Sequence, residues 1–391
     1  PKFLEGLKTG RNGITENTLF DTSEHSSKLA GVVKDINFEE YFDRKKLNKI
    51  DRFTAFAMIA SEEAVKSSGI DSESLDKTRI GVIIGSGVGG IQTMSEQHTR
   101  LLKSPRRVSP YFIPSMIADI AAGEVSIQYG FQGPNYCVVS ACASATHAIG
   151  DAFRMIKYGD ADAIITGGAD AAVVPIAVAG FGNMKALSKN VDINSASRPF
   201  DANRDGFVIA EGAGIVVLEE LEHAQKRGAN ILAELVGYGA TGDAHHLTAP
   251  SPDGNGAIRA MKRAIEDAGV AIEDIDYINA HGTSTPFNDR TESLAIKTLF
   301  GEHANKLFVS STKSMTGHSL GAAGGIEGIA CVLALQHGFI PPTINYTTPG
   351  PDCDLNYVPN KAINADISYS LSNTFGFGGH NGVLLFKKSE F

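Results

Sequence analysis

Ser140-Ala141-Cys142-Ala143-Ser144-Ala145 is the stretch that decides the fold. It joins an apolar run typical of a β-strand, Tyr136-Cys137-Val138-Val139, to a helix opening of small residues that continues to Gly150. A cysteine in the first turn of a helix lies beside unpaired backbone N–H groups and the positive end of the helix dipole, which favour thiolate over thiol. The sequence therefore suggests that Cys142 is a nucleophile, although buried cysteines more often serve as small apolar side chains.

The composition is that of a soluble globular protein. The chain has 391 residues, of which 42% are hydrophobic and 20% charged, and this length predicts two lobes or one large layered domain. A net charge of −9 argues against nonspecific nucleic-acid binding. No run approaches about 20 uninterrupted apolar residues and no secretory signal opens the chain, so we expect no membrane insertion and a cytoplasmic or organelle-matrix location.

The four cysteines show no metal or disulfide pattern. Cys137, Cys142, Cys331 and Cys353 have neither C-x-x-C spacing nor the density of a disulfide framework. We therefore expect no metal site and reduced thiols.

Strand-like and helix-like segments alternate along the chain. Residues 80–84 and 163–166 form continuous β-branched runs, whereas residues 52–67, 256–268 and 291–300 show helical patterns. This alternation predicts an α/β fold with mixed sheets. A faint internal repeat points to two related halves, because residues 308–311 lead into a Gly/Ala-rich segment as residues 137–140 lead into the Cys142 helix.

Three later segments each end an apolar β-like run in a loop rich in Gly, Ser and Thr. They are Asn279-Ala280-His281-Gly282-Thr283-Ser284-Thr285-Pro286, Ser311-Thr312-Lys313-Ser314-Met315-Thr316-Gly317-His318, and Asn373-Thr374-Phe375-Gly376-Phe377-Gly378-Gly379-His380-Asn381.

Together with the cysteine segment, in this order and over nearly the whole chain, these loops resemble the β-ketoacyl-acyl-carrier-protein synthases. The elongating type II enzymes are the most similar. The resemblance implies a thiolase-like, five-layered αβαβα fold with two pseudo-twofold-related halves and a homodimer. Residues 1–231 would carry the nucleophilic cysteine, and residues 232–391 the catalytic histidines and lysine. Family members normally begin with a short strand that this sequence lacks, and we expect this to bear on stability more than on chemistry.

The resemblance also implies a reaction, the decarboxylating Claisen condensation of malonyl carrier protein with a cysteine-bound acyl chain during fatty acid elongation. Cys142 would carry the acyl chain, since a thiolate attacks thioesters readily. Its own N–H and that of Phe377 would form the oxyanion hole, an aid worth roughly 3 kcal/mol per donor. His281 and His318 would both point Nε2–H at the malonyl thioester oxygen, and neutral imidazoles suffice for this.

Further residues take roles only through the resemblance. Lys313 would orient a histidine or hold positive potential over the site, with Glu327 as its counter-charge. The residues assigned to substrate contacts are Thr283, Thr285, Phe181, Val88 and Glu327. The two threonines would bind the amides of a phosphopantetheine arm, Phe181 and Phe377 would gate the pocket, and Val88 would line the far end of the acyl channel.

Basic residues would dock the acidic carrier protein. The positions that match the family are Lys45, Lys49, Arg106, Arg107 and Lys185. Without the resemblance, each basic run reads as a solvated face. We expect no resident metal or organic cofactor, because the carrier protein brings its own phosphopantetheine and the chemistry runs through the substrate's thioester and carboxylate.

Three alternatives compete with this interpretation. Gly317-His318-Ser319-Leu320-Gly321 matches the nucleophile elbow of serine α/β-hydrolases, with Asp354 and His380 following in the required order. Gly85-Ser86-Gly87-Val88-Gly89-Gly90 matches a dinucleotide-binding pattern but lacks the acidic residue about 20 positions later. A catalytically dead partner subunit of a polyketide system is disfavoured, because such subunits usually lack the cysteine.

Overall fold

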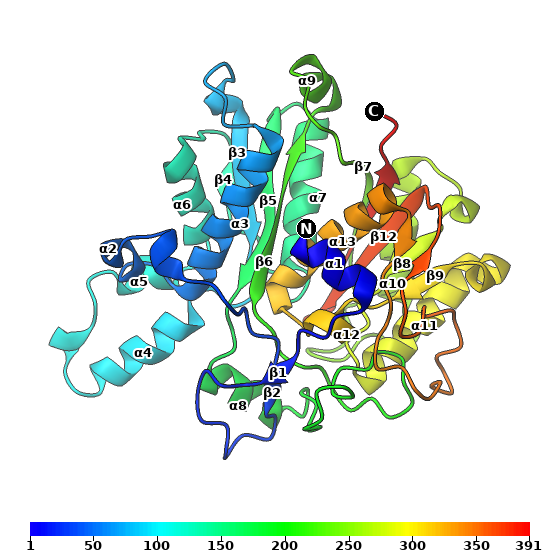
Figure 1. The fold of residues 1–391 in the computed structure, drawn as a ribbon, viewed down its shortest axis with the longest axis horizontal. Helices are drawn as coiled ribbons and strands as arrows, with labels where there is room; N and C mark the ends of the chain where they lie inside the picture. Colours follow the sequence, from blue (N-terminus) through cyan, green and yellow to red (C-terminus); the bar gives the residue numbers. More distant parts are fainter.

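Two β-sheets lie face to face across a central pair of helices, and further helices cover the outer face of each sheet (Figure 1). The structure is a computed structural model that describes residues 1–391. The order of layers is helix, sheet, helix, sheet, helix, and the five-layered α/β prediction is confirmed.

The first sheet is mostly parallel. Its strand order is β4 (Asn135–Tyr136), β3 (Ile80–Gly85), β5 (Ala163–Asp170) and β6 (Gly212–Glu219), with only β6 antiparallel to its neighbour. Every residue of β3 and β5 is buried, because helices cover both faces, and this explains their continuous apolar sequences. The outer helices are α3 (Arg52–Ser68) and α6 (Ile120–Tyr129).

The second sheet repeats this arrangement with one more strand. Its order is β7 (Ala233–Gly242), β13 (His380–Lys388), β12 (Tyr369–Gly376), β8 (Tyr277–Asn279) and β9 (Phe308–Ser310). Strands β12, β8 and β9 are parallel, and β13 is antiparallel to both of its neighbours. Helices α10 (Asn255–Ala268) and α11 (Pro286–Phe300) cover the outer side.

The middle layer consists of α7 (Ser144–Lys157) and α13 (Ala323–His337), one from each half of the chain. Their close packing requires glycine, because a Cβ on Gly324 would lie 2.0 Å from Thr146 Oγ1. The segment Leu320–His337 is long and apolar enough to cross a membrane by composition, yet 67% of it is buried. Its apolar character is therefore that of a core helix packed between two sheets.

Shorter elements connect these layers. The helices are α1 (Lys2–Thr9), α2 (Arg44–Leu47), α4 (Ile91–Leu101), α5 (Phe112–Met116), α8 (Pro175–Asn183), α9 (Leu221–Lys226) and α12 (Lys313–Thr316). The strands form two small antiparallel pairs, β1 (Thr15–Glu16) with β2 (Leu29–Ala30) and β10 (Phe339–Ile340) with β11 (Ile363–Asn364). Single 3-10 turns are η1 (Phe38–Glu40), η2 (Lys77–Arg79), η3 (Pro105–Arg107), η4 (Ile272–Asp274), η5 (Gly301–Asn305) and η6 (Leu320–Ala322).

Three local predictions need correction. Helix α11 begins at Pro286 rather than at residue 291, because proline is well suited to the first helical position. Of the strand-like run at 136–139, only Tyr136 is in a strand, because β4 covers Asn135–Tyr136. This short strand is the edge of its sheet and pairs with β3 alone. Helix α7 begins at Ser144, so Cys142 precedes the helix instead of lying in its first turn.

Candidate active site

Cys142 lies in a tight turn between the edge of the first sheet and α7. Ala141 has a φ of 52°, a left-handed conformation that is costly for a residue with a Cβ, and an isolated bridge joins Ser140 to Cys142. Ser284 and Leu320, beside two other loops of the site, also have positive φ values of 68° and 51°. Strained residues of this kind mark positions that the surrounding structure holds in place.

The surroundings of Cys142 contradict the expectation of a resting thiolate. Its side chain is 8% exposed, and burial raises the pKa of the thiol to about 12. The Lys313 ammonium and the backbone N–H groups of Phe377 and Cys142 lower this pKa, but burial outweighs them. The thiol is therefore protonated at neutral pH, because desolvation disfavours the anion more than the helix end favours it.

Alkylation should report this high pKa directly. We expect the rate of carbamidomethylation of Cys142 by iodoacetamide to rise about tenfold per pH unit from pH 7 to pH 9.5, because only the thiolate reacts. The rate would be followed by the mass of the peptide that contains Cys142, with Cys142→Ala as the background. A plateau below pH 8 would show a stabilised thiolate and contradict the argument from burial.

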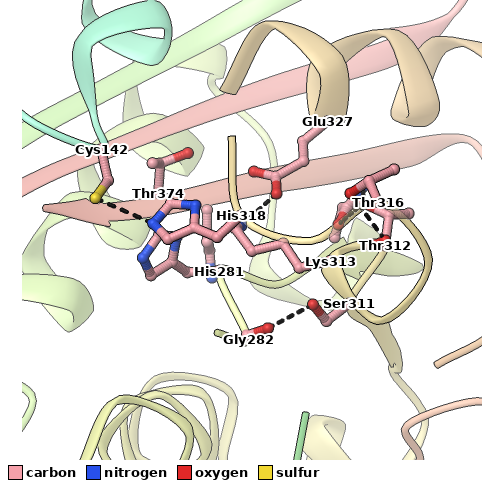
Figure 2. A network of polar contacts seen from close by, with 12 residues as sticks. Cys142, His281, Gly282, Ser311, Thr312, Lys313, Thr316, His318, Glu327 and Thr374 are labelled. Atoms are coloured by element: carbon pink, nitrogen blue, oxygen red, sulfur yellow. Dashed lines mark hydrogen bonds and ion pairs between the residues drawn. The ribbon is translucent and has the colours of Figure 1, made fainter. Parts of the chain in front are cut away.

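Two imidazoles converge on the sulfur (Figure 2). His318 Nε2 lies 3.1 Å from Cys142 Sγ. The rings of His281 and His318 stand edge to face with centroids 5.3 Å apart, and each residue is 2% exposed. The structure thus brings the cysteine and both predicted histidines, which are far apart in the sequence, into one buried cluster.

The loops of both histidines are held by backbone hydrogen bonds. Glu292 on α11 accepts from the N–H of His281 at 2.9 Å and from that of Gly282 at 2.8 Å. The N–H of His318 donates to Val208 O at 2.8 Å. Each imidazole therefore projects from a backbone fixed by a neighbouring segment.

Both imidazoles are neutral and carry their proton on Nε2. Burial and the nearby Lys313 ammonium hold the pKa of His281 and of His318 well below the usual histidine range. The Nδ1 atom of each ring is buried without a hydrogen-bond partner. A buried N–H without an acceptor is costlier than a buried lone pair, so the proton belongs on Nε2. This supports the expectation of two Nε2–H donors aimed into the site.

Lys313 and Glu327 form a buried ion pair behind the histidines. Lys313 is 2% exposed, and its Nζ donates to Glu327 Oε1 (Figure 2). Burial raises the pKa of Glu327 to about 7 while the ammonium opposes that rise. Since Lys313 pairs with Glu327 and not with an imidazole, the geometry favours the positive-potential role over histidine orientation. Glu327 is itself 2% exposed, so both members of the ion pair are buried.

Phe377 lies in the turn that joins β12 to β13, beside the cysteine turn. Its backbone N–H and that of Cys142 both lower the pKa of the Cys142 thiol. The preceding Gly376 allows this approach, because a Cβ there would lie 3.0 Å from Ser140 O and 3.2 Å from Cys142 N. The arrangement offers two N–H donors to an oxygen on a carbonyl attached to Cys142.

The residues expected to contact substrate come from separate segments of the chain. Thr283 and Thr285 share a hydrogen bond of 2.9 Å between their hydroxyls. Phe181 packs 6.4 Å from Phe377, measured between ring centroids, so the two proposed gating residues are neighbours. Val88 is 38% exposed.

The predicted docking residues stay outside the cluster. Lys45, Arg106, Arg107 and Lys185 are exposed, and Lys49 is half-buried with its ammonium 4.6 Å from the ring of Tyr111. The first four stand free of any ion pair, whereas the neighbouring Lys46 is bound to Glu124. Lys45 lies on α2 and Lys49 two residues after it, Arg106 and Arg107 lie on η3, and Lys185 lies two residues after α8. Figure 1 shows α2 at the left side of the molecule and α8 at its lower end.

Sequence reasoning missed two buried carboxylates. Glu292 holds the His281 loop, and Asp170 accepts hydrogen bonds from Ser86 Oγ and from three backbone N–H groups, including that of Gly321 at 2.6 Å. Burial raises the pKa of Asp170 to about 6. No sequence signal marks them, because a single acidic residue in a helix or at a strand end is ordinarily solvated.

The structure also decides between the competing motifs. The segment before Ser319 is helix α12 and not a strand, and Asp354 pairs with Lys297 at 2.6 Å on the surface, so the hydrolase alternative is wrong. In the glycine-rich loop, the N–H groups of Gly87 and Val88 donate to Asp170. These donors are therefore not free to bind a phosphate.

Comparison with known families and proteins gives matches over nearly the whole chain. The family described as "Beta-ketoacyl synthase, N-terminal domain" matches residues 1–224, and "Beta-ketoacyl synthase, C-terminal domain" matches residues 232–347. The 3-oxoacyl-[acyl-carrier-protein] synthase 2 of Staphylococcus aureus strain COL is 54% identical over 387 residues, which are 99% of this chain and 94% of that protein. Its counterpart in Synechocystis is 51% identical over 390 residues, covering 99% and 94%.

A solved structure is similar over the same length. It is described as a type II PKS acyl-carrier protein in complex with its ketosynthase bound to the hexaketide. The TM-score is 0.93 at 33% identity, covering all of this chain and 95% of that chain.

Proposed function

This chain belongs to the β-ketoacyl synthase family, and we propose how its clustered side chains divide the work of condensation. It is a 3-oxoacyl-[acyl-carrier-protein] synthase of the elongating type, an acyltransferase of fatty acid synthesis. The observation that carries the assignment of roles is the convergence of Cys142, His318 and His281, with 3.1 Å between the sulfur and the first imidazole.

In the first half-reaction, Cys142 takes the acyl group from a carrier thioester. The sulfur attacks the carbonyl carbon, the bond to the pantetheine sulfur breaks, and the thiol proton passes to that departing sulfur. The carbonyl oxygen becomes an oxyanion between the N–H groups of Cys142 and Phe377. Because the resting thiol is protonated, the incoming thioester meets a neutral nucleophile that is activated as it reacts.

In the second half-reaction, a malonyl thioester loses carbon dioxide. The pair of electrons from the broken C–C bond moves onto the thioester oxygen, and Nε2–H of His281 and of His318 stabilise that enolate. Its carbon attacks the acyl group on Cys142, and the carbon–sulfur bond breaks to release the 3-oxoacyl product. The sulfur then regains a proton from solvent.

Lys313 acts through its field and touches neither reacting group. Its ammonium lowers the pKa of Cys142 and of both imidazoles. The same positive potential favours the thiolate and the enolate, the two anions that the reaction creates. Glu327 keeps the buried ammonium paired, since an unpaired charge at this depth would be far costlier.

Reconstitution tests the assignment. Purified protein supplied with an acyl carrier protein thioester and malonyl carrier protein should yield a 3-oxoacyl carrier protein two carbons longer, with one carbon dioxide per product. Mass spectrometry of the carrier proteins would show the product, and a carbon dioxide assay would show the gas. Formation of free fatty acid without elongation would instead indicate a hydrolase and overturn the assignment.

Substrate delivery by an acidic carrier protein is the second part of the proposal. It is supported by the exposed, unpaired cations Lys45, Arg106, Arg107 and Lys185, with Lys49 beside them. The similar ketosynthase is described in complex with its acyl carrier protein. No resident metal or organic cofactor is required, because the carbanion comes from the substrate's own carboxylate and the carrier supplies the phosphopantetheine arm.

We also propose that the protein is a homodimer that works in the cytoplasm. Within the chain, we place the boundary between the two halves at residues 231 and 232. The boundary is supported by the gap between the two family matches. The dimer is supported by the short edge strand β4, which is followed by Val139 at 62% exposure, and by exposed apolar side chains on α4 and α5 such as Met94 and Ile113. Sedimentation at the monomer mass would exclude it.

A further inference from the structure

We infer that His147 is a positioning residue that sets the spacing of the two oxyanion-hole donors. This inference rests on the proposed function, and it concerns a side chain to which the sequence assigned no chemistry. His147 lies on α7 and forms hydrogen bonds with Ser140 at one ring nitrogen and with Asn381 at the other.

The two partners of His147 belong to the two separate segments that supply the oxyanion hole. Ser140 precedes Cys142 by two residues, and its hydroxyl lies 2.7 Å from His147 Nδ1. The carbonyl oxygen of Asn381 lies 3.3 Å from His147 Nε2. Asn381 is the second residue of β13, just after the turn that carries Phe377. One imidazole therefore bridges the cysteine turn of the first half and the hairpin turn of the second.

The direction of both hydrogen bonds follows from chemistry. The Asn381 carbonyl can only accept, so Nε2 of His147 must donate. Burial lowers the pKa of His147, so the ring is neutral and its Nδ1 has a lone pair. The Ser140 hydroxyl then donates to Nδ1. A neutral imidazole with one donor and one acceptor satisfies both partners at once.

The neighbouring packing shows that this bridge is built into the fold. A Cβ on Gly382 would lie 2.7 Å from Thr146 Cγ2 and 3.1 Å from His147 Nε2, so only glycine on β13 lets α7 approach this closely. Thr146, the residue before His147, donates its hydroxyl to Thr374 Oγ1 on β12 at 2.8 Å. The start of α7 is thus fastened to both strands of the hairpin.

Such a bridge matters because oxyanion stabilisation depends steeply on donor placement. Removing one donor costs about 10²- to 10³-fold in rate, and displacing a group by about 1 Å can cost about 10²-fold. Decarboxylation uses the two catalytic histidines and not these amides. The bridge should therefore affect acyl transfer selectively.

Four variants test the inference. His147→Phe fills the same space and removes both bonds, while His147→Asn retains an acceptor for Ser140 and His147→Gln retains a donor for Asn381. Ser140→Ala removes one bond and leaves the imidazole in place. His303→Phe is a matched control. His303 lies outside the site, and its Nε2 donates to the Ile275 carbonyl at 2.9 Å.

Single-turnover acylation of Cys142 and carbon dioxide release from malonyl carrier protein are the two readouts. We expect His147→Phe to slow acylation about 10- to 100-fold, with KM and decarboxylation within about twofold of wild type. The acylation rates of His147→Asn, His147→Gln and Ser140→Ala should lie between those of wild type and His147→Phe. Combining Ser140→Ala with His147→Phe should slow acylation little further, because both changes remove the hydrogen bond between Ser140 and His147.

Unchanged acylation in His147→Phe, or equal loss of both readouts, would overturn the inference. Should His147→Phe fail to fold, normal acylation in Ser140→Ala would overturn it. Failure of the wild-type protein to acylate Cys142 would instead reject the proposed function, so the two failures are distinguishable.

Discussion

Replacing Cys142 with alanine is expected to lower acyl transfer and condensation by about 10⁴-fold or more. The sulfur alone forms the covalent intermediate, and loss of a nucleophile removes the reaction path that the remaining groups serve. The measurement is formation of 3-oxoacyl carrier protein, with the mass of the intact enzyme reporting acylation.

Cys137 provides a matched control for this variant. It lies five residues earlier in the same segment, and burial raises its pKa to about 11, but its thiol donates to the Val138 carbonyl at 3.5 Å and is not hydrogen-bonded to either histidine. Cys137→Ala should keep activity within about threefold of wild type. Condensation above about 1% of the wild-type rate in Cys142→Ala would mean that another group carries the acyl chain.

The second large effect is expected at the two imidazoles. His281→Ala should slow carbon dioxide release from malonyl carrier protein by about 10²- to 10³-fold, because one of two enolate donors is lost. Its acylation rate should change little, since His281 does not contact the sulfur. His318→Ala should lose decarboxylation to the same extent and also acylate more slowly, because His318 Nε2 lies 3.1 Å from Cys142 Sγ.

The pH dependence gives an independent check on the same step. Because the pKa of both histidines lies well below 6.5, the neutral donors persist to lower pH than free imidazole would. Decarboxylation should therefore show no inflection between pH 6 and pH 8 that depends on His281, whereas Glu327, whose pKa burial raises to about 7, can titrate in this range. An inflection there that disappears in His281→Ala would contradict neutral donors, and His380→Ala, at an exposed strand end, is the control.

The alternation of strands and helices was readable from local sequence pattern, whereas the five-layered fold and the candidate site were expected through the resemblance of four loops to a known family. The buried runs of β3 and β5 are continuous and β-branched, helix α10 shows clear periodicity, and glycine follows the C-terminus of both α3 and α10. The four loops carry chemically distinctive residues in a fixed order. Such features can be recognised in the sequence without knowledge of tertiary contacts.

What the sequence could not provide were the energetic consequences of burial. The helix end beside Cys142 predicts a low pKa, yet the sulfur is closed in by the second half of the chain and burial reverses the sign. Glu292, Asp170 and His147 act through partners 7 to 234 residues away in the sequence. No local pattern distinguishes them from solvated or purely structural residues.

The most direct test of the central claim is the position of the acyl group on the wild-type enzyme. The protein would be incubated with carrier proteins bearing acyl chains of graded length and no malonyl donor, then digested and analysed by peptide mass spectrometry. The account predicts one acyl group, on the peptide containing Cys142, with Cys137, Cys331 and Cys353 unmodified. An acyl group on Ser319, or on any residue other than Cys142, would contradict it.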